Sequence, residues 1–144
     1  MTSFKHLMVM AVLLFAVGCQ SLNQPEPDSL YEDLGQRAGI AQIIEDMLYG
    51  VVDDTRIAFQ FKGVDIVELH QGLTDHICQL SGGPCTYSGR DMREAHKDMN
   101  ITATQFNALT ENLILAMEKN RISTSAQNRL LARLAPLHSE VRNL

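Results

Sequence analysis

Residues 82–101, GGPCTYSGRDMREAHKDMNI, decide how the rest of this 144-residue chain is interpreted. The Gly-Gly-Pro opening predicts a break in the structure, because glycine permits positive φ and proline blocks helix continuation. After a short polar turn, a brief helical run would place Met92, Ala95, His96 and Met99 on one side. A buried imidazole needs a partner for each ring nitrogen. His96 is therefore either a core histidine with satisfied nitrogens or a ligand.

Length and composition predict one folded domain with a sizeable core. Hydrophobic residues make up 45% of the chain and charged residues 20%, as in a soluble globular protein. The net charge is -5 and there is no basic stripe, which argues against a nucleic-acid partner. The absence of tryptophan and an aromatic content of 6% argue against an aromatic-lined carbohydrate site.

Residues 1–18 have the features of a signal peptide and are excluded from the fold. Lys5 provides a weakly positive start, and the apolar run from Leu7 to Val17 is too short to span a bilayer as a helix. The end of this segment and the residue after it read Ala16-Val17-Gly18-Cys19. These four residues resemble a bacterial lipoprotein box with Cys19 as the lipidated residue. An ordinary cleaved signal peptide is the alternative.

The residue after Cys19 is Gln20, which is not an acidic retention signal, so we expect an anchor in the outer membrane facing the periplasm. Residues 19–28 then comprise the lipidated cysteine and a polar, proline-bearing linker. Residues 29–144 form the folded domain.

The rest of the domain shows helical spacing of its apolar residues and no sustained alternation. An all-α fold with about five substantial helices is therefore predicted. Asp65 is the expected cap of one helix, capping boxes are expected at Ser29, Thr102 and Thr124, and Pro136 should kink or interrupt the last helix. The inward-facing residues are expected to be Ile40, Ile43, Ile44, Met47, Leu48 and Val51; Ile66, Leu69, Leu73, Ile77 and Leu80; Phe106, Leu109, Leu113 and Met117; and Leu130, Leu131, Leu134 and Leu137.

The chain from Leu30 to about Val141 resembles the truncated haemoglobins of group 1. The segments that carry the resemblance are LYEDLG at 30–35, AGIAQII at 38–44, GGPCTYSGRDMREAH at 82–96 and NIT at 100–102. The resemblance implies a truncated globin fold, a two-over-two helical sandwich around haem b, with His96 as the proximal iron ligand. The sequence contains no Cys-x-x-Cys-His motif, so attachment of the haem through two thioethers is not expected.

The resemblance also implies roles for residues around the haem. Met92, Ile101 and Phe106 would pack on the porphyrin, although each is equally explicable as a core residue. Phe61 corresponds to a phenylalanine that wedges the haem in the family, and Gln60 departs from the usual pair of phenylalanines there. Tyr87, Arg90 and Arg93 lie where relatives hold the propionates or brace the loop before the proximal helix; for the arginines, a solvated surface position is the alternative.

The distal side departs from the best-known members of the family. Ungapped alignment places Leu48 where the family usually has its distal tyrosine, and Leu69 and Leu73 where glutamines often stand. The expected distal pocket is therefore apolar. His76 lies on the same helical stripe, where relatives often have a bulky apolar residue. It is expected to touch the haem edge and supply a polar contact or proton, or to ligate the iron when no gas is bound; a position at the outer rim of the pocket, in contact with solvent, is the alternative.

Cys78 and Cys85 remain once Cys19 is assigned to the anchor. In an oxidising periplasm they could form a disulfide that closes a short loop before the proximal segment. Spacing alone does not decide whether they do.

The first functional hypothesis is a membrane-tethered haem protein that reversibly binds O₂, CO or NO. An NO dioxygenase or a peroxidase-like enzyme is an alternative, but each needs an electron donor, and the redox partner is unknown. A haem-based sensor and a haem-free structural lipoprotein are the remaining alternatives.

Overall fold

A computed structural model describes residues 29–142 of the chain. The signal peptide, Cys19 and the whole linker predicted from the sequence lie outside the described residues. None of the helices within 29–142 is long and apolar enough to cross a membrane.

The described region is helical, as predicted, and its only β-type contact is one isolated bridge between Ile101 and Arg142. Four helices have 11 residues or more, rather than about five, because the segment before His96 forms a single turn. The elements are α2 (Leu30–Asp33), α3 (Gln36–Asp53), η1 (Ala58–Phe61), α4 (Ile66–Leu80), α5 (Met92–Ala95), α6 (Ala103–Lys119), α7 (Thr124–Leu134), η2 (Ala135–Leu137) and α8 (His138–Val141).

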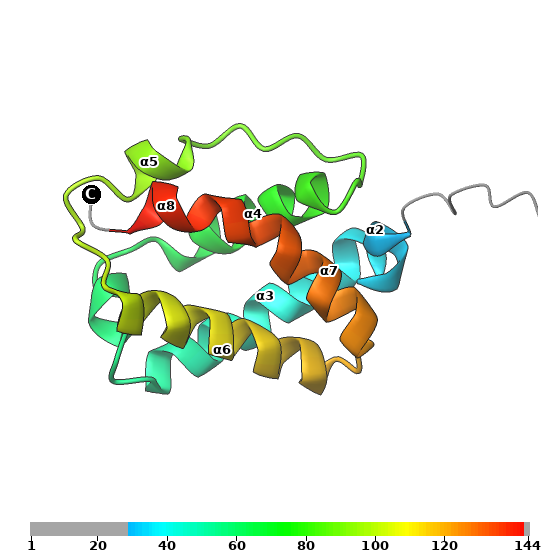
Figure 1. The fold of residues 1–144 in the computed structure, drawn as a ribbon, viewed down its shortest axis with the longest axis horizontal. Coiled ribbons are helices and arrows are strands. Elements are labelled where there is room, and N and C mark those ends of the chain that lie inside the picture. Colours follow the sequence, from blue (N-terminus) through cyan, green and yellow to red (C-terminus); the bar gives the residue numbers. More distant parts are fainter. Residues whose placement is uncertain (1–28, 143–144) are drawn as a thin grey trace, which may run out of the picture.

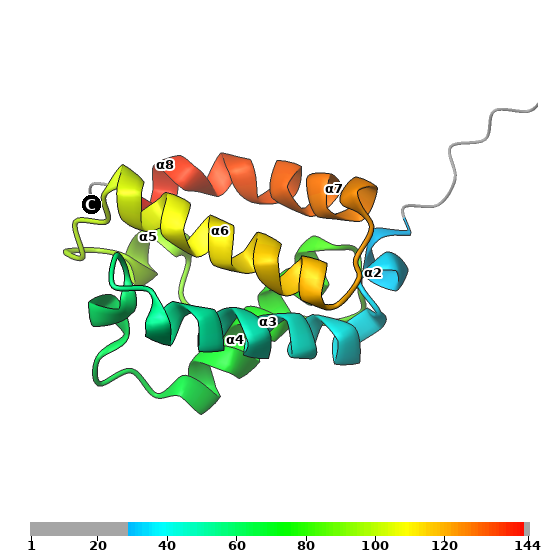
Figure 2. The same cartoon turned by 90° about the horizontal axis from the view of Figure 1, so that it is seen from below.

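Helix α3 lies at the centre of the molecule and packs against both α4 and α6. Figures 1 and 2 show the resulting two layers, one made of α3 and α4 and the other of α6 with α7 and α8. All six apolar residues that the sequence predicted for the inner face of α3 are buried, from Ile40 to Val51. Burying one such side chain is worth about 1.5–3 kcal/mol, so this face is the largest contribution of any helix to the core.

Two of the predicted helix caps are confirmed. Asp65 accepts hydrogen bonds from the amides of Val67 and Glu68. Thr102 and Gln105 form the reciprocal capping box at the start of α6.

The other two capping boxes were wrong. At Ser29 the backbone has φ -83° and ψ 10°, which is not extended, and its hydroxyl donates to the Asp33 carboxylate instead of capping α2. At α7 the cap is Ser123, whose extended backbone lets its hydroxyl accept from the amide of Ala126. Thr124 is the first helical residue.

Chain breaks fall where glycine and proline predict them. Gly35 has φ 80° and separates α2 from α3, and Gly82 has φ 86° just after α4. Pro136 lies in the short 3₁₀ turn η2 that separates α7 from α8. This turn changes the direction of the last helix, and α8 then contacts α5.

The C-terminal end of α3 is held to the middle of α6 by a polar cluster. The side-chain amide of Asn112 donates to the carboxylate of Asp54 and to the carbonyl of Ala108. The guanidinium of Arg56 lies 2.7 Å from Asp54 and lowers the pKa of that carboxyl well below its ordinary value. A Cβ at Gly50 would lie 2.4 Å from Oδ1 of Asn112, so a larger residue there would force the Asn112 side chain to move.

Candidate functional site

His96 directly follows the one-turn helix α5 and forms its C-terminal cap. Asp91 caps the N-terminus of α5, and its side chain accepts a hydrogen bond from the amide of Glu94 at 2.8 Å. The sequence had placed His96 within a helical run, but the chain leaves the helix at Ala95. Soon afterwards, Asp98 and Asn100 adopt positive φ values of 64° and 49°. These turns end the helical path and direct the chain towards α6.

The ring of His96 is fixed by one hydrogen bond. Nδ1 lies 2.7 Å from the carbonyl oxygen of Met92, and because a carbonyl only accepts, Nδ1 carries the proton. Nε2 then has a free lone pair, and it makes no hydrogen bond to any residue between 29 and 142. A histidine held in one tautomer by a backbone carbonyl has the arrangement expected of a metal ligand.

The residues predicted for the distal pocket come together in the structure. Leu48 on α3 is 7% exposed and belongs to the main apolar cluster of the core. Leu69 and Leu73 of α4 and Phe61 of η1 are partly buried and pack against the same cluster. These four side chains therefore contribute to one apolar cluster from three elements, and the set is called the apolar wall below.

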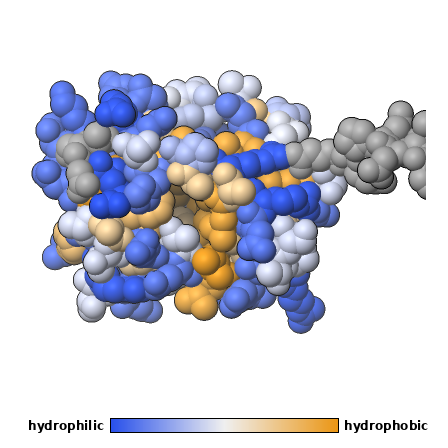
Figure 3. All heavy atoms as spheres, viewed as in Figure 1, coloured by the Kyte–Doolittle hydropathy of each residue, from blue (hydrophilic) through white to orange (hydrophobic). Residues whose placement is uncertain are grey.

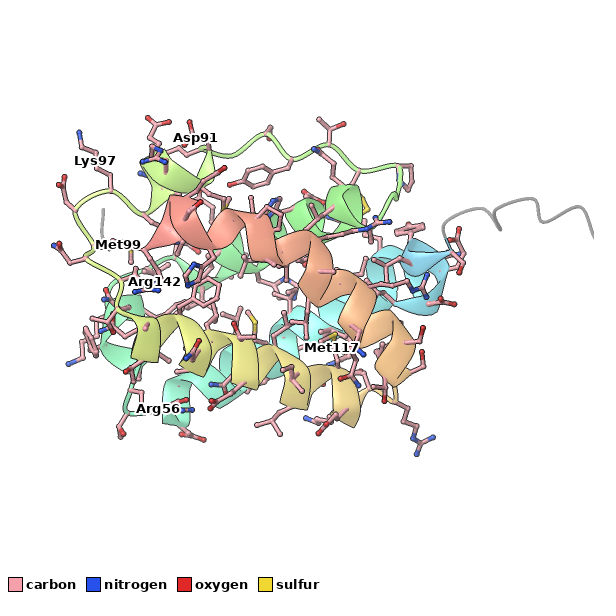
Figure 4. All side chains as sticks on the ribbon, in the orientation of Figure 1. Arg56, Asp91, Lys97, Met99, Met117 and Arg142 are labelled. Carbon is pink, nitrogen blue, oxygen red and sulfur yellow. A yellow bond between two sulfur atoms is a disulfide. The ribbon has the colours of Figure 1, made fainter. Side chains whose placement is uncertain are left out.

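The residues predicted to contact the porphyrin on the proximal side are more widely spread. Met92 is half-buried on α5, and Phe106 is half-buried near the start of α6. Ile101 is buried and pairs with the backbone of Arg142. In Figure 4, Arg142 lies between the end of α8 and the start of α6, whereas Asp91 and Lys97 point outward.

Many inward-facing side chains between α4, α5, α6 and α8 are only half-buried, in contrast to the sealed inner face of α3. Figure 3 shows hydrophobic residues reaching the surface in a band near the middle of the face, with hydrophilic residues on either side of it. The half-buried residues in this part of the molecule include Phe61, Leu69, Leu73, Met92, His96, Phe106 and Leu109. Apolar walls with a single fixed imidazole fit a flat apolar cofactor that carries a metal ion.

The residues predicted near the propionates, Tyr87, Arg90 and Arg93, lie on α5 and in the loop before it. Arg90 and Arg93 are both exposed, and neither forms an ion pair with a described residue. Arg93 lies with Asp91, Glu94, Lys97 and Asp98 around an open depression on the outer side of α5. Tyr87 donates its hydroxyl to the carbonyl of Arg90 at 2.8 Å, so its polar end is already engaged.

His76 packs against the loop that precedes α5. Its ring centroid lies 4.8 Å from that of Tyr87, with the planes tilted by 40°. Burial lowers its pKa below the ordinary value of 6.5, so the neutral ring is favoured in the folded protein. The contact with Tyr87 could not be read from helical spacing, because the loop brings Tyr87 back along α4.

Two further histidines have structural contacts that the sequence analysis did not assign. Nε2 of His70 lies 2.9 Å from the carbonyl of Ala41 and links α4 to α3. His138 on α8 meets the ring of Phe106 edge-on at 4.6 Å, and its Nε2 accepts from the guanidinium of Arg142. The sequence analysis had no signal for the contact of His138 with Phe106, because it depends on how α8 packs against α6.

Cys78 and Cys85 are joined by a disulfide with a Cα–Cα distance of 5.7 Å. The sequence had left this pairing open. The bridge links the C-terminal half of α4 to the loop before α5.

Comparison with known proteins places this arrangement in a family. A family model described as bacterial-like globin matches residues 29–143. A group 1 truncated haemoglobin from Tetrahymena pyriformis is 31% identical over 103 residues, which cover 72% of this chain and 85% of that protein. The chain belongs to the group 1 truncated haemoglobins.

Solved structures of the family have the same fold. The truncated haemoglobin of Tetrahymena pyriformis in its Fe(III) form superposes with a TM-score of 0.77 at 27% identity, covering 80% of this chain and 98% of that one. The two-over-two haemoglobin of a Synechococcus species, described in the cyanomet state with covalently attached haem, gives a TM-score of 0.74 at 26% identity over 80% and 98% of the two chains. The two-over-two sandwich predicted from the resemblance is therefore confirmed.

Because His76 has a lowered pKa in the folded protein, acid should weaken the fold through this residue. The unfolded chain takes up a proton near pH 6.5, before the folded chain does, so the contribution of His76 to stability is complete above that pH and declines below it. We expect His76→Phe to remove this decline. The difference in Tm between wild type and variant should change between pH 8 and pH 5.5, and a constant difference would show that His76 does not titrate differently on folding.

Proposed function

We propose that this protein binds haem b through Nε2 of His96 and reversibly binds a diatomic gas on the opposite side of the haem. The observation that carries the proposal is the fixed ring of His96, whose Nδ1 donates to Met92 while Nε2 keeps a free lone pair. Membership of the group 1 truncated haemoglobins supports it, since relatives are described with Fe(III), cyanide-bound and haem-containing states. When bound, the haem iron supplies the coordination position that a gas can occupy.

The residues around the site divide into three tasks. His96 holds the cofactor from the proximal side, with Met92 and Phe106 as apolar contacts. Leu48, Leu69, Leu73 and Phe61 exclude water from the distal side. Arg90 and Arg93, which are exposed and form no ion pair with a described residue, would meet the propionates, as the resemblance to the family implies.

Two observations favour haem b over thioether-linked haem. The sequence contains no Cys-x-x-Cys-His motif. Cys78 and Cys85 are bonded to each other, so neither offers a thiol to a vinyl group.

The apolar distal wall determines the gas chemistry we propose. Bound O₂ carries partial negative charge, and a hydrogen bond to it is worth about 1–3 kcal/mol, as for other charged acceptors. Leu48, Leu69 and Leu73 cannot donate such a bond. O₂ should therefore be released quickly, and CO and NO, which depend less on a donor, should be favoured. This protein is then a poor candidate for tight oxygen storage.

Replacing His96 tests the proximal assignment. The wild-type protein should give a five-coordinate ferrous absorption spectrum that converts on addition of CO. His96→Ala should lose the haem or its five-coordinate spectrum, and added imidazole should restore binding, because it replaces the missing ligand. His138→Ala is the matched control and should keep the wild-type spectrum. An unchanged ferrous spectrum in His96→Ala would exclude His96 as the ligand, and a six-coordinate wild-type spectrum would indicate a second internal ligand, with His76 the first to test.

The distal assignment is tested by returning a donor to the pocket. Leu48→Tyr should slow O₂ dissociation about tenfold or more, since about 1.4 kcal/mol corresponds to a factor of ten. Leu48→Phe has a ring of similar size without the hydroxyl and should stay close to wild type. Stopped-flow measurement of O₂ and CO dissociation checks both. Slow O₂ release in the wild type, unaffected by either variant, would show that another residue donates to the bound gas.

We also propose that Cys19 anchors the protein in the envelope, most consistently in the outer membrane facing the periplasm. The lipoprotein-box resemblance at residues 16–19 supports this, as does a disulfide in the folded domain, which suits an oxidising compartment. In a bacterial host, the wild type should fractionate with membranes and incorporate labelled palmitate. Cys19→Ser should do neither. An unlabelled wild type that is released as a soluble protein would point instead to an ordinary cleaved signal peptide.

A further inference from the structure

The loop between α4 and α5 connects the helix that carries Leu69 and Leu73 to the short helix that His96 caps. Figure 1 shows it leaving the end of α4 and returning along the length of that helix to reach α5. From Gly82 to Asp91 it contains no helix or strand. Such a segment holds α5 in place only if its own contacts fix it.

The first fixed point is the disulfide. Cys78 is completely buried on α4, and its bond to Cys85 attaches the beginning of the loop to the helix. The turn between them is close-packed, because the amide of Gly83 donates to the carbonyl of Cys78 at 2.8 Å. A Cβ at Gly83 would lie 2.7 Å from Sγ of Cys78 and 2.5 Å from the ring of Tyr31.

The second fixed point is Tyr87. Its amide donates to Oε1 of Gln79 at 2.7 Å, and its ring rests against His76, so two residues of α4 hold it. On the loop side, a Cβ at Gly89 would lie 2.4 Å from the Tyr87 hydroxyl, so the loop closes tightly over the ring.

From Tyr87 the contacts continue to His96 without interruption. The Tyr87 hydroxyl donates to the carbonyl of Arg90, and the next residue, Asp91, is the cap that starts α5. The carbonyl of Asp91 accepts from the amide of Ala95 at 2.8 Å. The carbonyl of Met92, in the same turn, accepts from the ring of His96.

We propose that the Cys78–Cys85 disulfide, Gln79 and Tyr87 form a brace that fixes the position of His96 relative to α4. This brace makes haem retention depend on the oxidation state of the two cysteines. The dependence on haem rests on the function proposed above. A dithiol reductant supplies two electrons and two protons, the S–S bond breaks to give two thiols, and the reductant becomes a disulfide. The loop is then attached to α4 without a covalent bond, through the contacts of Tyr87 and the hydrogen bond from the Gly83 amide to the Cys78 carbonyl.

The experiment measures the rate of haem loss to an apomyoglobin acceptor. Reduction of the wild type by a dithiol, or the double substitution Cys78→Ser and Cys85→Ser, should accelerate haem loss about tenfold, as is typical when support for a metal ligand is removed. Gln79→Met should also accelerate haem loss. Gln79→Glu keeps an acceptor oxygen for the Tyr87 amide and should lose haem as slowly as the wild type. Equal rates in the oxidised and reduced wild type would overturn the proposal.

A test variant and a control variant distinguish a specific effect on the position of His96 from a general loss of stability. Tyr87→Phe removes only the hydroxyl bond to Arg90 and should shift the iron–histidine stretching band in resonance Raman spectra. Gly50→Ala crowds Asn112 at the distant α3–α6 junction and should lower stability without shifting that band. A shift of equal size in both variants would show that the brace has no specific effect on His96.

Hydrogen exchange distinguishes failure of the brace from failure of haem binding. The amides of Ala95 and His96 are bonded within α5, and in the haem-free protein their exchange should become faster on reduction of the disulfide. If haem does not bind but this acceleration occurs, the proposed function fails and the brace stands. If the exchange of both amides is unchanged on reduction, the brace is refuted whether or not haem binds.

Discussion

The hydrogen bond from Nδ1 of His96 to the carbonyl of Met92 is the interaction on which the proposed site depends. It sets the tautomer of the ring, and so determines which nitrogen keeps a lone pair. A helix of four residues contributes little stability by itself, since helix nucleation is unfavourable. The position of this bond must therefore be imposed from outside α5. Its neighbours are α8, which contacts it directly, and the loop that the disulfide and Tyr87 fasten to α4.

The buried face of α3 plays the corresponding role for the fold. It packs on α4 and α6 together, so the distal helix and the second layer share one support. Polar contacts set the ends of this packing: Asp54 and Asn112 at one end, and Asp46 with Lys119 and Asn120 at the other. These contacts are directional, whereas apolar burial is not, so they select the register in which the helices meet.

The parts of the structure that follow from local patterns were predictable from the sequence. The apolar spacing of α3, the cap at Asp65, the capping box at Thr102 and the interruption at Pro136 all depend on neighbouring residues alone. The errors arose where backbone angles or tertiary contacts decide. Ser29 has the right neighbours for a capping box but the wrong ψ, and Ser123 displaces Thr124 by one residue. The convergence of Leu48, Leu69 and Leu73 followed from family alignment, whereas the contact of His76 with Tyr87 depends on the course of a loop that no periodicity describes.

Helix α4 therefore contributes both to the apolar wall and to the support of His96 proposed above. One set of α4 side chains, Leu69 and Leu73, joins the apolar wall with Leu48. Another set in its C-terminal half, His76, Cys78 and Gln79, holds the loop that leads to α5 and His96. A movement of α4 would change the distal wall and the support of His96 together. In the function proposed above, an apolar distal wall would give a bound gas little hydrogen-bonding stabilisation. Control of gas binding would then fall more heavily on the side of His96, where a disulfide joins α4 to the loop before α5.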